Sequence, residues 1–377
     1  MKDNSMQKVK KMRDSGKFAV IFVCLMAALY FVVTLCVFIK PAGEYSDTER
    51  RLLAQLPAFT WEELWSGKYV GELEEYMTDQ FPLRDEMRSV KANFSMNVMK
   101  KQDTSNIYVK DGYLCKMEYP MDEDSIYRAT SIFENFYETY LKNTEVSPYI
   151  AIVPDKNYFL ADSGVLSMDY EEFYGQVYQQ VPHLTPISIA ENLQLTDYYK
   201  TDTHWKQEEI IDVAATLAEY MDVPFEGDFT QEKTDVPFYG VYYGQAGLDV
   251  PPDEIVYCTS DRLKECIVYD HENDKEIPLY NKQSLVGRDP YEMFLGGNIS
   301  LATIESPNAL SDKELVVLGD SFSRSLLPLL AESYQKITLV DIRYIWSGQV
   351  GNYVEFTDQD VLFLYSTSVI NDSITLK

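Results

Sequence analysis

The stretch YYKTDTHW, residues 198–205, holds one of only three histidines in the chain, with an aspartate two residues before it. In an extended backbone these two side chains point the same way, so the Asp202 carboxylate could fix the tautomer of His204 and stabilise its cation. An imidazole held like this is a general base for a nearby hydroxyl. The alternative is a capped helix start, with Asp202 or Thr203 as N-cap and His204 merely exposed.

A candidate hydroxyl lies in ELVVLGDSFSRSLLPLL, residues 314–330, where an apolar run meets Gly319, Asp320 and Ser321 and then an amphipathic helical stretch. In open α/β sheets, ligands bind at the carboxyl ends of the strands. A helix that starts there supplies backbone N–H groups that can stabilise a developing oxyanion. The alternative is that Ser321 is an N-cap. His204 is the preferred base, because His183 in VPHLTP and His271 in YDHEND lie in turn-like or surface segments. No cysteine or histidine cluster has zinc-ligand spacing, so no metal is expected.

The elements that must position these residues are short Val, Ile and Leu-rich strands alternating with helical stretches, typical of an α/β sheet covered by helices. Four strands are predicted, over residues 149–154, 314–320, 336–344 and 361–367. Residues 222–300 are richer in Gly, Pro and Tyr, which indicates loops and antiparallel pieces. Cys258 and Cys266 are near enough in sequence to be bonded across a hairpin, but an odd third thiol, Cys115, and the size of the domain favour free, buried cysteines.

The first hundred residues have a different character. Residues 18–39 form an apolar run without a charge, about 33 Å long as a helix and therefore able to span a bilayer. Residues 1–17 hold six basic and two acidic side chains, so the positive-inside rule predicts a cytoplasmic basic tail and an exterior remainder. A cleaved signal peptide is the alternative. We predict a helical juxtamembrane segment over 40–100, interrupted by Pro57 and Pro82, and a catalytic domain over 101–377.

The charge limits the possible partners. The chain has a formal charge of −27, and because the basic tail contributes +4, the remainder carries −31. Nucleic acid is therefore an unsuitable partner. Long-range repulsion also disfavours strongly anionic polymers unless a basic groove overcomes it.

Two motifs together carry a family resemblance. LGDSFS resembles the first block of the SGNH hydrolases, and YYKTDTHW resembles the signature of the DHHW family, which is related to the alginate O-acetylation proteins AlgJ and AlgX. Further segments agree in the expected order from residue 48 to the end of the chain: TERRLLAQLP, GKYVGELEEYMTDQFPLRD, KDGYL, IVPDKN, YEMFLGGNIS and VDIRY. The resemblance implies an SGNH-hydrolase-like parallel sheet flanked by helices, preceded by one transmembrane helix and a short helical segment.

The sequence departs from the usual pattern in two ways. The serine follows the Asp-x-His pair instead of preceding it, a permuted order that favours the alginate-type branch over an ordinary esterase. The family's middle histidine is Thr203 here, which impairs the protein only if that histidine does chemistry.

By resemblance, Ser321 is the nucleophile, His204 the base and Asp202 the orienting acid, and the Ser321 N–H donates to the oxyanion. Three weaker assignments for the oxyanion site or the substrate pocket are Asn298, Arg343 and Tyr365. Their alternatives are a turn cap, a structural ion pair and core packing, respectively.

The function implied is an extracytoplasmic, membrane-anchored O-acetyltransferase that modifies a surface or secreted polysaccharide through an acyl-serine. It needs no cofactor, and a membrane-bound O-acyltransferase partner would supply the acetyl group. The alternatives are a carbohydrate esterase, in which water resolves the acyl-enzyme, and a non-catalytic anchored protein for glycan binding or assembly. The 29 tyrosines suit the last alternative, although aromatic residues more often fill cores.

Overall fold

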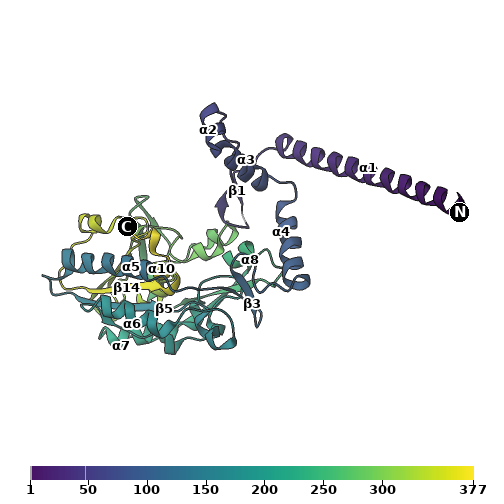
Figure 1. The fold of residues 1–377 in the computed structure, drawn as a ribbon. Coiled ribbons are helices and arrows are strands. Elements are labelled where there is room, and N and C mark those ends of the chain that lie inside the picture. The colour runs from purple at the N-terminus through teal and green to yellow at the C-terminus, as the bar shows by residue number, and fades with distance from the viewer. Residues whose placement is uncertain (1, 47) are drawn as a thin grey trace. The chain divides into compact units, whose positions relative to one another are not determined.

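The computed structural model describes residues 2–46 and 48–377, with side chains from residue 17 onward. The chain divides into two compact units, Met1–Val98 and Met99–Lys377, which are described separately (Figure 1). The roles predicted for the tail, the span, the juxtamembrane segment and the catalytic domain stay predictions.

The first unit begins with the helix α1, Lys2–Ile39. Its stretch Lys17–Ile39 is long and apolar enough to cross a membrane. Apart from Lys17, the side chains of the predicted basic tail, residues 1–17, lie outside the described part of the chain. The orientation of α1 in a membrane therefore stays a prediction.

Three short helices follow; Pro57 precedes the first, Gly67 separates the first two, and Pro82 lies between the last two. The elements after α1 are β1 (Tyr45–Ser46), β2 (Arg51–Leu52), α2 (Trp61–Ser66), α3 (Lys68–Asp79), α4 (Arg84–Asn93) and a π-helical turn (Phe94–Val98). Thr60 caps α2 by accepting a hydrogen bond from the Glu63 N–H, and Gly67 ends it with a φ of +82°, a conformation that glycine adopts without strain.

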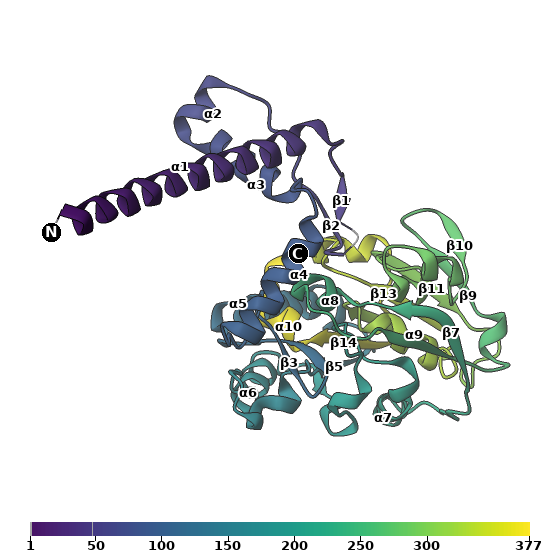
Figure 2. The same cartoon turned by 90° about the vertical axis from the view of Figure 1, so that its right-hand side faces the viewer.

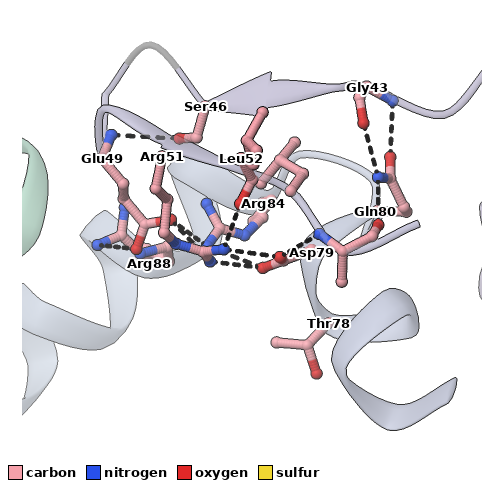
Figure 3. A network of polar contacts seen from close by, with 12 residues as sticks. Gly43, Ser46, Glu49, Arg51, Leu52, Thr78, Asp79, Gln80, Arg84 and Arg88 are labelled. Carbon is pink, nitrogen blue, oxygen red and sulfur yellow. Dashed lines mark hydrogen bonds and ion pairs between the residues drawn. The ribbon is translucent and has the colours of Figure 1, made fainter. Parts of the chain in front are cut away.

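An ionic network ties the β1–β2 hairpin to α3 and α4 (Figure 3). Asp79 at the end of α3 accepts two hydrogen bonds from the Arg51 guanidinium, at 2.6 and 2.8 Å, and one from the Ala54 N–H at 2.9 Å. The hydrogen bonds from Arg51 hold the pKa of the Asp79 carboxyl below its usual value. Glu49 pairs with Arg84 and Arg88 of α4. Because these charges are partly buried, the pairs fix the hairpin more firmly than exposed pairs would.

The second unit is built on one mixed sheet, which confirms the predicted fold class. Its strands, in spatial order, are β10 (Lys275–Ile277), β9 (Ile267–Asp270), β11 (Leu301–Glu305), β13 (Lys336–Val340), β12 (Glu314–Gly319), β14 (Asp360–Ser366), β5 (Ser147–Val153) and β6 (Thr185–Pro186). The strands from β13 to β6 are parallel, and β11, β9 and β10 add antiparallel pairs at one edge. The strand predicted over 336–344 ends earlier, at Val340, because Asp341 begins a turn.

Helices cover both faces of this sheet. Leu315 and Val317 of β12 share one hydrophobic cluster with α7 (Ile211–Tyr220) and α9 (Ser323–Leu330). Val316 and Leu318 point to the other face and share a second cluster with α5 (Glu123–Phe136) and α6 (Tyr170–Gln180). This alternation along β12 is that of a central strand buried on both sides.

The remaining elements are hairpins and short helices. They are β3 (Ile107–Lys110), β4 (Tyr113–Lys116), β7 (Thr230–Phe238), α8 (Val241–Ala246), β8 (Asp253–Thr259) and α10 (Thr367–Asn371). Short 3-10 or π-helical turns span Tyr137–Leu141, Tyr158–Ser163, Ala190–Asn192, Leu195–Asp197, Gln207–Glu209, Leu263–Glu265, Lys282–Val286, Pro290–Met293, Ser347–Asn352 and Ser373–Thr375. The region 222–300 therefore does consist of loops and antiparallel pieces, as its composition predicts.

Candidate active site

The structure brings Asp202, His204 and Ser321 together, although 117 residues separate the histidine from the serine. The Asp202 Oδ2 lies 2.5 Å from the His204 Nδ1, and the His204 Nε2 lies 2.8 Å from the Ser321 Oγ. With the proton on Nδ1 and donated to the carboxylate, Nε2 presents its lone pair to the serine hydroxyl. This is the order of contacts in a Ser-His-Asp triad; the catalytic roles themselves stay predictions.

A tight loop presents the histidine. Tyr198 and Trp205 form an isolated antiparallel bridge, and the Tyr199 N–H donates to the His204 carbonyl at 3.1 Å. The following helix, α7, begins only at Ile211, so Asp202 does not cap it. The Asp202 carboxylate instead accepts hydrogen bonds from the N–H groups of His204 and Val241, at 3.2 and 2.7 Å. The alternative of a capped helix start is therefore wrong.

A second aspartate, Asp253, fixes the histidine loop, residues 198–205. Asp253, at the start of β8, accepts hydrogen bonds from the Lys200 N–H at 2.8 Å, the Thr201 N–H at 2.7 Å and the Thr201 hydroxyl at 2.6 Å. The Gly240 N–H donates to the Thr201 hydroxyl oxygen at 2.9 Å. These bonds fix the backbone on the N-terminal side of Asp202.

A buried lysine, Lys156, also binds the backbone of this loop. The Lys156 Nζ donates to the Tyr199 carbonyl at 3.0 Å and lies 5.0 Å from the centre of the Tyr242 ring. Burial lowers the pKa of this ammonium group to about 8. The Tyr242 hydroxyl donates to the Thr203 Oγ1 at 3.1 Å, so the residue that replaces the family's middle histidine contacts α8 and makes no hydrogen bond to the triad within the described residues.

The loop is also joined to the helix that follows the serine. The Trp205 Nε1 donates to the Ser325 Oγ at 2.9 Å, and the Gln207 Nε2 donates to the Ser325 carbonyl at 2.7 Å. Trp205 is fully buried, which explains why a tryptophan directly follows the histidine. The segments that carry His204 and Ser321 are thus joined by hydrogen bonds through Ser325.

Aromatic rings define the plane of the imidazole. The Tyr291 ring stacks on the His204 ring at 3.9 Å with an interplanar angle of 8°. The Phe322 ring lies 5.0 Å from the imidazole on a tilted plane. The Tyr291 hydroxyl contacts the Ser325 Oγ at 2.9 Å, so the stacked ring cannot turn freely.

Ser321 itself occupies the turn between β12 and α9. Asp320 shapes this turn, because its carboxylate accepts from the Phe322 N–H at 3.0 Å and from the Ser366 N–H at 2.8 Å. The helix begins at Ser323 with Phe322 as N-cap and no side-chain cap, so the N-cap alternative for Ser321 is wrong. Ser321 is partly exposed, and its backbone N–H has no protein acceptor among the interactions of the described residues, so it is free to bind an oxyanion.

The three weaker candidates lie outside hydrogen-bonding contact with the triad in the described structure. Asn298 is exposed, and its Oδ1 accepts from the Arg324 Nη1 at 2.8 Å. Arg343 donates twice to Asp341, at 2.6 and 2.9 Å. Tyr365 is buried and its ring stacks on Phe133 at 5.0 Å. The ion-pair and packing alternatives thus describe what Arg343 and Tyr365 do here.

The sequence reasoning assigned no role to Arg324, Tyr291 or Gly240. Arg324 follows Ser321 by three residues, and its buried Nη2 has no hydrogen-bond partner but lies 3.8 Å from the Asp341 carboxylate. Burial lowers the pKa of this guanidinium. An arginine three residues after the serine was a usable signal in the sequence, whereas no local sequence pattern marks Tyr291 or Gly240.

Sequence expectations also concern the cysteines and the possible metal ligands. All five cysteines are free thiols, including Cys258 and Cys266. In the part of the chain that the structure describes, no group of three or more His, Cys, Asp or Glu side chains could hold a metal ion.

No protein-family model and no curated protein matches the chain in sequence. Solved structures do share its fold. A DHHW family protein from Eubacterium siraeum DSM 15702 is 19% identical, with 71% of this chain and 93% of that chain covered and a TM-score of 0.55. Bacillus cereus PatB1, solved with a sulfonyl adduct, is 18% identical, with 70% and 95% covered and a TM-score of 0.57. The O-acetyltransferase domain of Pseudomonas putida AlgJ is 14% identical, with 71% and 92% covered and a TM-score of 0.43. The predicted relation to the DHHW family is confirmed at the level of the fold.

Proposed function

We propose that this chain is an extracytoplasmic, membrane-anchored O-acetyltransferase that modifies a surface or secreted polysaccharide through an acyl-serine intermediate. The observation that carries the proposal is the hydrogen-bonded chain from Asp202 through His204 to Ser321, at 2.5 and 2.8 Å. A serine hydroxyl is a weak nucleophile, and a base positioned at this distance activates it.

The reaction has two steps. The Ser321 Oγ attacks the acetyl carbonyl of the donor while the His204 Nε2 takes the hydroxyl proton, and the donor's leaving group departs with that proton. A sugar hydroxyl then gives its proton to His204 and attacks the acetyl-serine carbonyl, and the proton returns to the Ser321 oxygen as the sugar ester forms. The Ser321 N–H is the proposed oxyanion donor, with the Asn298 Nδ2 as a second candidate, since only the Oδ1 of that side chain is bonded to Arg324.

The shared fold supports this proposal. PatB1 carries a sulfonyl adduct in its structure, and sulfonyl reagents are electrophiles that capture activated nucleophiles. We infer that an aryl sulfonyl fluoride would label Ser321 here.

The donor must come from within the membrane if the second unit is outside the cell, because acetyl-CoA is absent there. We propose a membrane-bound O-acyltransferase as the partner that passes the acetyl group across. The apolar stretch Lys17–Ile39 would keep the two proteins in the same membrane. Copurification of the full chain from its native membrane tests for this partner.

A carbohydrate esterase is the second candidate, because Ser321 is partly exposed and water could therefore reach an acyl group on it. The same triad would serve, with water in place of the sugar hydroxyl. The ratio of transfer to hydrolysis in the presence of glycan acceptors separates the two activities.

The test is mass spectrometry of the full chain in detergent micelles after exposure to an activated acetyl ester. We expect an adduct of about 42 Da on Ser321, as acyl-serine chemistry requires. It should be absent in Ser321→Ala and form about 10² to 10⁴ times more slowly in His204→Gln. An adduct elsewhere, or equal rates in wild type and His204→Gln, would refute the triad. Glycan that removes the acetyl group and becomes acetylated would establish transfer.

A further inference from the structure

On the face of the sheet that α5 and α6 cover at its β5 end, a groove lies over β9, β11, β13 and β12. The crossover from β13 to β14 runs over residues 341–359 and contains only the 3-10 turn Ser347–Asn352. In Figure 2, α5 and α6 lie toward the β5 end of the sheet, and β9, β10 and β11 lie at the other end. The groove between this crossover and the strands has a volume of about 510 Å³, within the size range of small-ligand sites.

The floor of this groove is a set of cross-strand rows. In one row Thr303 of β11 pairs with Thr338 of β13, and these residues are flanked by Tyr269 of β9 and Val316 of β12. In the next row Lys336 lies between Glu305 and Glu314. Four strands span about 14 Å, which gives a flat floor with room for a short oligomer.

The floor of the groove is partly polar, because it includes Thr303 and Thr338. Thr338 is only 8% exposed, and its hydroxyl has no hydrogen-bond partner among the described residues. Thr303 is 8% exposed and its Oγ1 lies 2.8 Å from the His271 Nε2. The Thr338 hydroxyl is therefore available to form a hydrogen bond with a polar ligand in the groove.

The walls supply aromatic and charged groups. Tyr353, in the crossover segment, lines the groove with 61% of its surface exposed, and Tyr269 lines it from β9. Aromatic faces stack on the apolar faces of sugar rings, while flanking hydroxyls and carboxylates bond to sugar hydroxyls. The lining holds three glutamates against one lysine, Lys336, which Glu314 already pairs at 3.4 Å. This charge repels anionic ligands.

We propose that this groove binds a segment of a non-anionic glycan chain as a subsite for the polymeric acceptor. The inference rests on the proposed function, because it assumes that a polysaccharide is the acceptor. Ser321 lies just beyond the end of β12, about 15 Å along the strand direction from the floor residue Val316. The groove therefore holds a part of the polymer that is distant from the reacting hydroxyl, and it favours long acceptors over short ones.

The test is binding of defined hexaoses to the full chain in detergent micelles. The probes are β-1,4-linked hexamers of glucose and of N-acetylglucosamine, their monomers, and a hexameric uronate. We expect at least one neutral hexaose to bind more tightly than its monomer and than the uronate. The variants Thr338→Val and Tyr353→Ala should each raise its Kd about tenfold, which is the loss of one hydrogen bond or one stacking contact.

The control variant is Tyr127→Ala, which removes a tyrosine of similar exposure, 68%, from α5 outside the groove. It should leave the Kd unchanged. The groove assignment is overturned if no neutral hexaose binds, if the uronate binds best, or if Thr338→Val and Tyr353→Ala bind as wild type does.

A second readout separates this inference from the proposed function. Ser321→Ala should bind the hexaose as wild type does, and Thr338→Val should still form the acetyl adduct at Ser321. Binding without any adduct in wild type would leave the groove assignment standing and refute the acetyltransferase. An adduct at Ser321 of wild type without hexaose binding would refute the groove assignment and leave the acetyltransferase proposal standing.

Discussion

At the scale of single residues, the position of Asp202, and with it that of His204, depends on a glycine that makes no contact with Ser321. A Cβ atom built on Gly240 would lie 2.2 Å from the Asp202 Cβ and 2.4 Å from its Cα. No side chain fits at that distance, so the backbone of one of the two loops would have to move.

We therefore predict that Gly240→Ala slows acetylation of Ser321 at least about 100-fold, because a displacement of about 1 Å at a catalytic group has that effect. The rate is measured by adduct formation. Gly175→Ala is the matched control: the site lies inside α6 with no atom within 4 Å of the added Cβ, so it should be fully active and about 0.5–1 kcal/mol more stable. Full activity in Gly240→Ala would show that the Asp202 loop tolerates movement.

Glu208 gives a prediction about pH. Burial raises the pKa of its carboxyl to about 7 from an ordinary 4.5, and among the described residues its Oε2 has no hydrogen-bond partner. The folded state thus binds this proton more tightly than the unfolded state does. The associated stability is present below pH 4.5 and is lost as the pH rises to 7.

Glu208→Gln should therefore be more stable than wild type at pH 8, by up to about 3 kcal/mol, and the difference should shrink toward pH 4.5. Thermal unfolding across this pH range measures it. The control is Glu209→Gln, which removes the same charge from an exposed neighbouring side chain. An equal gain in both variants would assign the effect to net charge.

At the scale of elements, the histidine loop and α9 behave as one unit because Ser325 receives bonds from two sides. Its Oγ contacts the Trp205 Nε1 and the Tyr291 hydroxyl, both at 2.9 Å. Trp205 and Tyr291 come from segments far apart in the sequence, and Ser325 belongs to the helix that follows the nucleophile.

We predict that Trp205→Phe and Ser325→Ala are strongly non-additive. Each single variant removes the Trp205–Ser325 hydrogen bond but leaves the other partner one contact, Ser325 Oγ with the Tyr291 hydroxyl at 2.9 Å and Trp205 Nε1 with the Phe322 carbonyl at 3.2 Å. Each should therefore lose about 0.5–1.5 kcal/mol. The double variant should lose less than the sum, with a coupling of about 0.5–1.5 kcal/mol. Thermal unfolding of all four proteins gives the cycle, and strict additivity would mean that the two elements are held independently.

The elements themselves were largely predictable, because apolar runs such as that of β12 are local signals of buried strands. The sequence also pointed to Asp202, His204 and Ser321. The spacing of the first two and the strand-end position of the third are patterns that can be read within a few residues. The sequence did not point to Tyr291, Gly240 and Asp253, because each acts through contact across 40 to 90 residues of chain that no local pattern encodes. Asn298, Arg343 and Tyr365 were placed by resemblance, and the structure gives each of them another close contact.

At the scale of the whole molecule, the division into Met1–Val98 and Met99–Lys377 separates the apolar helix from every residue of the candidate site. The second unit holds the complete sheet and both of its hydrophobic clusters. A unit with its own core is expected to fold independently.

We predict that a chain starting at Met99 is monodisperse without detergent and forms the Ser321 adduct at the rate of the full chain, since the triad and its supports all lie after that residue. The full chain should instead partition into liposomes through its apolar helix. Flotation of both proteins with liposomes, followed by adduct mass spectrometry, measures anchoring and reactivity in one experiment. Ser321→Ala in the short chain controls for non-specific acetylation. If the short chain folds by circular dichroism but does not react, then the first hundred residues contribute to the site; if it floats as the full chain does, the membrane contact lies in the second unit.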